Sequence, residues 1–148
     1  MQSKKLSFGF IAALVLLAGA VIMTAGPAAS QESVLHSFGE RSTDGTDPEI
    51  SLIFDAAGNL YGTTSSGGAY SYGTVFELTP TPGGGWTETV LHNFGNGKDG
   101  STPYASLILD AAGDLNGTTF KGGAYGLGTV FELSPQGDGR PVGGEVAA

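Results

Sequence analysis

Residues 48–80 read PEISLIFDAAGNLYGTTSSGGAYSYGTVFELTP, and residues 103–135 repeat the pattern as PYASLILDAAGDLNGTTFKGGAYGLGTVFELSP. The two segments are identical at 23 of 33 aligned positions. Similarity at such a period indicates a repeat protein, in which each unit buries its apolar faces against a neighbour.

The similarity extends upstream of both segments. VLHSF at residues 34–38 corresponds to VLHNF at residues 90–94. We therefore expect two tandem repeats within residues 31–135, the first at about 34–89 and the second at about 90–135.

The repeat unit contains short apolar runs that are rich in β-branched and aromatic residues. In the first repeat they cover residues 51–54, 60–64, 74–78 and 86–94, and each is bounded by Gly, Pro, Asp or Asn. Short apolar runs bounded by turn-forming residues are typical of β-strands joined by turns. Beyond residue 30, no stretch without Gly or Pro exceeds nine residues, which leaves little room for helices. The sequence predicts an all-β fold with one four-stranded antiparallel meander in each repeat.

The predicted strands carry apolar residues on both faces. Val75 and Phe76 are adjacent and must point to opposite sides of a strand. A sheet that is apolar on both sides has to lie between two layers, as the blades of a β-propeller do. Two blades cannot close a ring, so we expect an incomplete propeller. Either several chains assemble, or the sequence is part of a longer protein. We also expect the strand at residues 34–38 to complete the second repeat.

Residues 1–30 have the pattern of a secretory signal peptide. Lys4 and Lys5 precede an apolar run over residues 6–23, and small residues follow. We expect a helical signal segment that is cleaved near Ser30–Gln31, and export to the periplasm, cell surface or extracellular space. The alternative is an uncleaved membrane anchor, since the run is just long enough to span a bilayer.

Composition excludes several classes of function. The chain has 148 residues, 26 of them Gly, and it has no Cys, which rules out disulfides and thiolate metal sites. With 14 acidic and 6 basic residues, its net charge is -8. Nucleic acid is not an expected partner, because binding phosphate needs a clustered basic surface. Residues 136–148 are expected to be a flexible tail.

Several motifs resemble those of a known family. They are D-x-x-G-N-L-Y-G-T-T at residues 55–64, G-G at 67–68, G-T-V-F-E-L at 73–78, and then Trp86 and V-L-H-N-F at 90–94. They resemble the GloVer tandem repeat of bacterial exported proteins, the choice-of-anchor tandem-repeat proteins. The resemblance implies a propeller-like array displayed outside the cytoplasm. It brings no established activity and no catalytic residue.

The acidic turns are the first candidate sites. Asp55 and Asn59, with their counterparts Asp110 and Asp114, could be read as calcium ligands. We favour hydrogen-bonded turns, in which the leading Asp accepts the backbone N–H groups two and three residues on and the Gly closes the hairpin. The same interpretation applies to Asp44-Gly45 and Asp99-Gly100.

The two histidines and two strand glutamates are weaker candidates. His36 and His92 share a predicted strand face with apolar residues, which favours a partly buried structural role, and no acid or histidine nearby in the sequence suggests a second ligand. Glu77 and Glu132 are copies of each other, whereas an acid and a base need different environments. We expect both glutamates at an edge or in solvent.

Aromatic residues in the loops suggest a binding surface for carbohydrate, although packing on blade edges is the favoured interpretation. These residues are Tyr61, Tyr70, Tyr72, Tyr104, Tyr125 and Trp86. The sequence assigns no catalytic, cofactor-binding or metal residue. It favours an exported, non-enzymatic structural or ligand-binding module that could self-associate to complete a propeller. The alternative is a fragment of a propeller hydrolase acting on carbohydrates or lactones.

Overall fold

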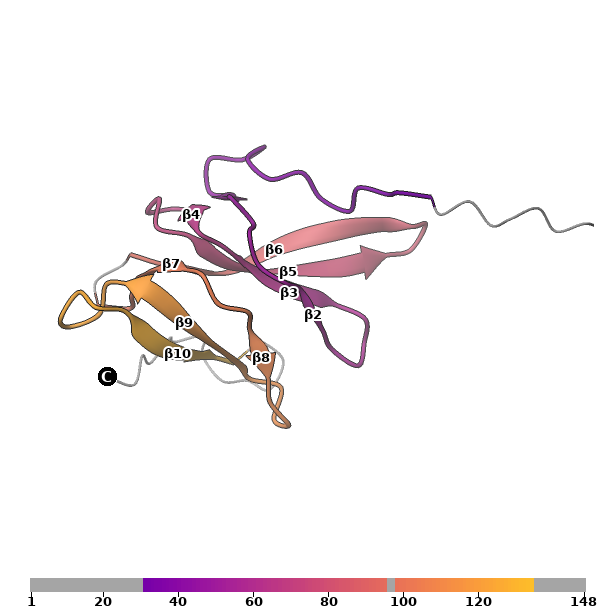
Figure 1. The fold of residues 1–148 in the computed structure, drawn as a ribbon. Helices are drawn as coiled ribbons and strands as arrows, with labels where there is room; N and C mark the ends of the chain where they lie inside the picture. Colours follow the sequence, from indigo (N-terminus) through magenta and orange to yellow (C-terminus); the bar gives the residue numbers. More distant parts are fainter. Residues whose placement is uncertain (1–30, 96–97, 135–148) are drawn as a thin grey trace, which may run out of the picture. The chain divides into compact units, whose positions relative to one another are not determined.

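The computed structural model describes residues 31–95 and 98–134 (Figure 1). The predicted signal segment and tail lie outside these residues. The chain divides into two units, Met1–Glu32 and Ser33–Ala148, and the strands all belong to the second. The described residues contain strands and no helix, which confirms the all-β prediction. They therefore include no helix that could cross a membrane.

The first repeat forms a four-stranded antiparallel sheet, as predicted. Its strands are β2 (Ile53–Phe54), β3 (Leu60–Thr64), β5 (Thr74–Thr81) and β6 (Gly85–Asn93), and they are ordered as they occur in the chain. Short loops between consecutive strands produce this meander. A register shift between Val75 and Phe76 interrupts the pairing of β5 with β6.

The second repeat preserves the central pairing of the first. Its strands are β7 (Ser101–Pro103), β8 (Ile108–Leu109), β9 (Leu115–Lys121) and β10 (Thr129–Leu133). Leu115 pairs with Leu133 in the second sheet just as Leu60 pairs with Leu78 in the first. Equal registers follow from the equal lengths of the loops that join the paired strands.

The second sheet is not the four-stranded meander that we expected. β7 and β8 both pair with β9, while β10 has no counterpart of β6 beside it among the described residues. The first-repeat counterpart of β7 is β1 (Gly45–Thr46), which pairs with β4 (Ser66–Gly67) in a separate two-stranded sheet. The second sheet thus includes the counterpart of β1, which the first sheet lacks, and it lacks a counterpart of β6.

The predicted role of residues 34–38 was wrong. These residues form no strand and do not complete the second sheet. The Phe38 ring instead packs on Phe76 of the first repeat, with ring centroids 5.0 Å apart. Phe94 packs on Phe131 in the same way, at 5.1 Å. Each VLHxF segment therefore supplies an aromatic side chain to the core of the repeat that it begins.

The first sheet is buried on both faces, as its sequence predicts. Phe76 lies in a cluster with Leu60 and Leu78, against which Phe38 and Trp86 pack. Val75 and Tyr61, on the opposite face, belong to a second cluster. The other buried members of that cluster come from the second-repeat segment: Phe94, Leu107, Leu115, Phe131 and Leu133. One face of the first sheet therefore packs against the second repeat.

Candidate functional site

A histidine and an aspartate are paired in each repeat. His36 Nε2 lies 3.5 Å from Asp44 Oδ2, and His92 Nε2 lies 2.9 Å from Asp99 Oδ2. The loops that follow the two VLHxF segments bring each aspartate back to its histidine. Sequence reasoning missed both partners, although a recurring histidine followed seven or eight residues later by a recurring aspartate was a visible signal.

Aromatic packing fixes the two histidine rings. His36 meets Phe38 edge to face at 4.7 Å, and His92 meets Phe94 at the same distance. The expectation of partly buried strand histidines is correct as to burial, although only His92 lies in a strand. The histidine–aspartate pair therefore recurs together with its aromatic neighbour in both repeats.

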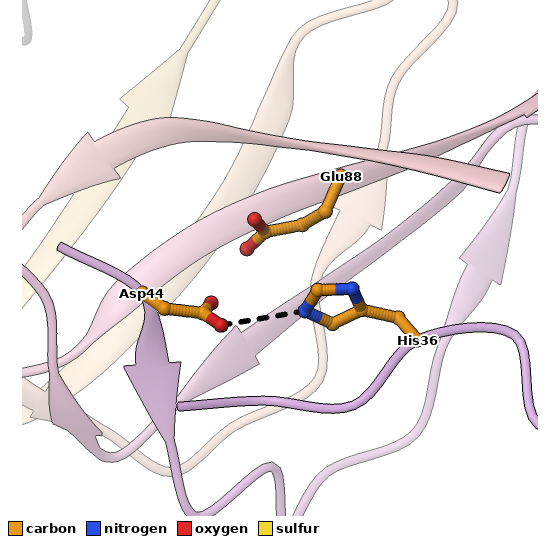
Figure 2. A group of neighbouring side chains, drawn as sticks. All are labelled: His36, Asp44 and Glu88. Carbon is orange, nitrogen blue, oxygen red and sulfur yellow. Dashed lines mark ion pairs between the residues drawn. The ribbon is translucent and has the colours of Figure 1, made fainter. Parts of the chain in front are cut away.

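The first repeat adds a third acid to its pair. Glu88 of β6 extends its carboxylate toward Asp44 and His36 (Figure 2). One ligand atom from each of the three residues lies within 4.8 Å of those of the other two. Asp44 and Glu88 are both buried, whereas Arg41, which donates from Nη2 to Glu88 Oε2 at 2.5 Å, is largely exposed. We call His36, Asp44 and Glu88 the acid–histidine cluster.

Each member of the acid–histidine cluster keeps a buried polar atom without a hydrogen bond. These atoms are His36 Nε2, Asp44 Oδ1 and Glu88 Oε1. The second oxygen of each carboxylate is occupied, since the Gly39 N–H donates to Asp44 Oδ2 at 2.8 Å and Arg41 donates to Glu88. Buried polar atoms without partners are uncommon and call for an explanation.

The two carboxyl groups have opposite pKa shifts. Burial raises the pKa of Glu88, and the negative charge and hydrogen bonding of Asp44 raise it further, against opposing effects of His36 and Arg41. Burial alone would raise the pKa of Asp44, but the Gly39 N–H, the Glu88 carboxyl group and His36 together hold that pKa below its ordinary value. Asp44 is therefore the ionised member of the pair, and Glu88 is the one that retains a proton more readily.

The acidic turns are hydrogen-bonded as we predicted, but the second N–H group comes from four residues on and not from three. Asp55 Oδ1 accepts the N–H groups of Ala57 and Asn59 at 2.8 and 2.9 Å. In the second repeat, Asp110 Oδ1 accepts those of Ala112 and Asp114 at the same distances. Asp110, Asp114 and Glu132 also lie close enough together to offer ligand atoms to an ion. Asp110 and Glu132 are exposed, and the turn itself accounts for the position of Asp110.

The two strand glutamates have different surroundings. Glu132 is exposed, as expected, but Glu77 is half-buried and accepts a hydrogen bond from the Tyr61 hydroxyl at 3.0 Å. Burial raises the pKa of Tyr61, and its bonds to Glu77 and Asp55 add to the shift. The second repeat has Asn116 where the first has Tyr61, so Glu132 lacks this hydroxyl partner, and β10 pairs only with β9 whereas β5 lies between β3 and β6.

The remaining aromatic candidates divide by burial. Tyr61 belongs to the core, and Trp86 packs against the cluster around Phe76. The loop tyrosines are all exposed: Tyr70, Tyr72, Tyr104 and Tyr125.

The fold and the recurring pairs define a tandem-repeat protein built from antiparallel β-sheets. Its sequence matches the model of the Gloeobacter/Verrucomicrobia repeat over residues 18–142, and the chain belongs to this family. The match confirms the resemblance to the GloVer repeat. No curated protein and no solved structure matched the chain in the same comparisons.

Proposed function

We propose that the protein is an exported, non-enzymatic repeat module that stacks head to tail with further copies of itself, in a propeller-like array at the cell surface or in the periplasm. The observation that carries this proposal is the unequal burial of Val75 and Val130. They occupy equivalent positions in β5 and β10, yet Val75 is 0% exposed and Val130 is 67% exposed.

The contact between the two repeats supplies the template for stacking. On the first sheet, Ile53, Tyr61 and Val75 form the back face, and they pack in the cluster that contains the second sheet's Leu107 and Phe131. This back-to-front packing covers Leu107, which is 3% exposed. A back face and a front face of this repeat are therefore complementary in shape.

Each half of that contact has a counterpart with exposed residues, although Phe38 and Trp86 already cover Phe76 on the front face of the first sheet. Ile108 and Val130 are the second-repeat equivalents of Ile53 and Val75, and both are exposed. Leu52 is the first-repeat equivalent of Leu107, and it is 44% exposed. A second copy could place the face of its first sheet that carries Leu52 against the face of the second sheet that carries Ile108 and Val130. This contact would bury the exposed residues of both faces. Such a head-to-tail contact uses two different surfaces and generates a ring or a filament.

The burial of the acid–histidine cluster supports a role without catalysis. Its unpartnered atoms are inaccessible to solvent, so a substrate could not reach them without opening the fold. In the part of the chain that the structure describes, the exposed residues Glu132 and Asp110 lie beside Asp114 and form no cluster with a histidine. The hydrolase alternative therefore gains no support from this geometry.

Sedimentation velocity over a range of protein concentrations tests the stacking. We expect concentration-dependent association of the full chain and its loss in Val130→Asp. Tyr125→Asp is the matched control, because Tyr125 is also exposed but lies in the turn between β9 and β10 and outside the template contact. A monomer at every concentration would contradict the proposal, as would equal disruption by both substitutions.

Export has its own test. The pattern of residues 1–30 predicts that a bacterial host secretes the protein and removes these residues. Mass spectrometry of the exported protein should then show a chain that begins at Gln31. Retention of the whole chain in the cytoplasm would oppose export without bearing on the stacking.

A further inference from the structure

We propose that His36, Asp44 and Glu88 form a binding site for a divalent transition-metal ion, with Zn²⁺ as the preferred ion. This site is independent of the stacking surfaces, because none of its residues belongs to the contact between the repeats. It is built from side chains that meet only in the folded first repeat, since Glu88 lies 44 positions after Asp44 in the sequence.

Three buried atoms without a hydrogen bond supply the donor set, and one of them, His36 Nε2, is also in the ion pair with Asp44 Oδ2. His36 Nε2, Asp44 Oδ1 and Glu88 Oε1 are each buried and without a hydrogen bond. The three residues also satisfy the mutual distance of 4.8 Å between ligand atoms. An imidazole nitrogen and two carboxylate oxygens are the ligands that zinc takes in proteins. One ion would satisfy all three atoms at once.

The other oxygen of each carboxylate is held by the protein. The Gly39 N–H holds Asp44 Oδ2, and Arg41 holds Glu88 Oε2. Hydrogen bonds of this kind orient ligating carboxylates and are a usual part of metal sites. Arg41 does not compete for the proposed metal position, since it contacts Glu88 Oε2 and the proposed ligand atom is Glu88 Oε1.

Charge favours a cation at this position. Two buried carboxylates face each other, and Arg41 contributes only one positive charge from the surface. Like charges in a buried site are costly unless a cation or a proton compensates them. A divalent ion would compensate both carboxylates, and the nitrogen donor favours zinc over calcium or magnesium, which prefer oxygen ligands.

The second repeat provides an internal control. His92 and Asp99 reproduce the pair of His36 and Asp44, but no third acid joins them among the described residues. Two ligands hold zinc much less well than three. The zinc site should therefore depend on His36 and be indifferent to His92.

Equilibrium dialysis of the full chain against zinc chloride, with the metal measured by atomic absorption, tests the site. We expect one Zn²⁺ per chain and a loss of affinity of at least about tenfold in Glu88→Gln and in His36→Gln. His92→Gln and Asp114→Asn should retain the wild-type affinity. Calcium and magnesium in excess should not displace the zinc.

A second measurement separates metal binding from folding. Glu88→Gln is close in shape to protonated Glu88, and circular dichroism in the presence of a chelator should show that it folds like the wild type. Zinc should then raise the melting temperature of the wild type and of His92→Gln, but not that of Glu88→Gln. Cobalt in place of zinc should give visible absorption bands that disappear in His36→Gln.

Three results would overturn the proposal. One is the absence of stoichiometric zinc binding by the wild type. Another is unchanged binding in Glu88→Gln. The third is loss of binding in Asp114→Asn instead, which would assign the zinc to the cluster of Asp110, Asp114 and Glu132 in the second repeat.

Discussion

Val75 and Val130 are equivalent residues of two paired repeats, and only Val75 is buried. The difference comes from the place of each repeat in the chain, since residues of the second repeat cover Val75. The same β-strand sequence, TVFEL, thus occupies a two-sided core in β5 and a one-sided sheet in β10.

Val75→Ala and Val130→Ala should therefore have unequal effects on stability. Removing buried methyl groups costs free energy through lost burial and a residual cavity, so Val75→Ala should lower the free energy of unfolding by about 1–3 kcal/mol. Val130→Ala should change it by less than about 0.5 kcal/mol in a dilute, unassembled chain. Urea denaturation followed by circular dichroism provides both values, and equal losses would contradict the difference in burial.

Phe94→Ala should destabilise the protein more than Phe38→Ala. Phe94 is buried and packs on Phe131, whereas Phe38 is half-buried on Phe76. Truncating a buried Phe costs about 3–5 kcal/mol, and a partly exposed one costs less. Thermal unfolding should rank the variants in this order. The reverse order would show that residues 34–38 contribute more to the core than residues 90–94 do.

Gly117→Ala should be destabilising, although the residue lies in a regular strand. A Cβ at Gly117 would lie 2.5 Å from Phe131 Cζ, so the Phe131 ring would have to move. Overpacking of this kind typically costs about 1–3 kcal/mol. Gly113→Asn is a suitable comparison, because a Cβ at Gly113 meets no atom and Asn tolerates its positive φ of 87°. Tolerance of alanine at Gly117 would contradict the close packing of Phe131.

The turn at Asp55 should make stability depend on pH in the acidic range. Burial opposes ionisation, but bonds from Asn59, Tyr61 and Ala57 hold the pKa of Asp55 below its ordinary value of 3.8. A lowered pKa in the folded state means that the ionised form stabilises the fold. This contribution is present above pH 3.8 and is lost as the pH falls through the lower pKa of the folded state.

Asp55→Asn should remove part of that dependence. Denaturation profiles at several pH values below 5 would show a shallower loss of stability in the variant than in the wild type. Parallel profiles would mean that other carboxyl groups produce the acid sensitivity.

The local features of the fold were predictable because they depend on residues close together in the chain. The Asp55 and Asp110 turns follow from an aspartate that accepts N–H groups two and four residues on, and from Gly58 and Gly113, whose φ angles are 89° and 87°. The two apolar faces of β5 follow from alternation along a strand. The repeated sequence makes the registers of the two sheets alike.

The site was not predictable in the same way. The pairing of His36 with Asp44 depends on the path of the intervening loop, and Glu88 reaches that pair from β6. The packing of Phe38 was also missed, because we expected a strand at residues 34–38. The same apolar pattern is typical both of a strand that pairs with a sheet edge and of a segment that packs on a sheet face.

The sequence by itself thus determined the repeat, the β-strands and the hydrogen-bonded turns, since these are set by short-range backbone preferences and by the alternation of apolar side chains. Only the tertiary structure decided which of two identical valines is buried and which histidine has a second acid beside it. Those outcomes depend on contacts between segments far apart in the chain, and a residue's own neighbours in sequence do not specify them.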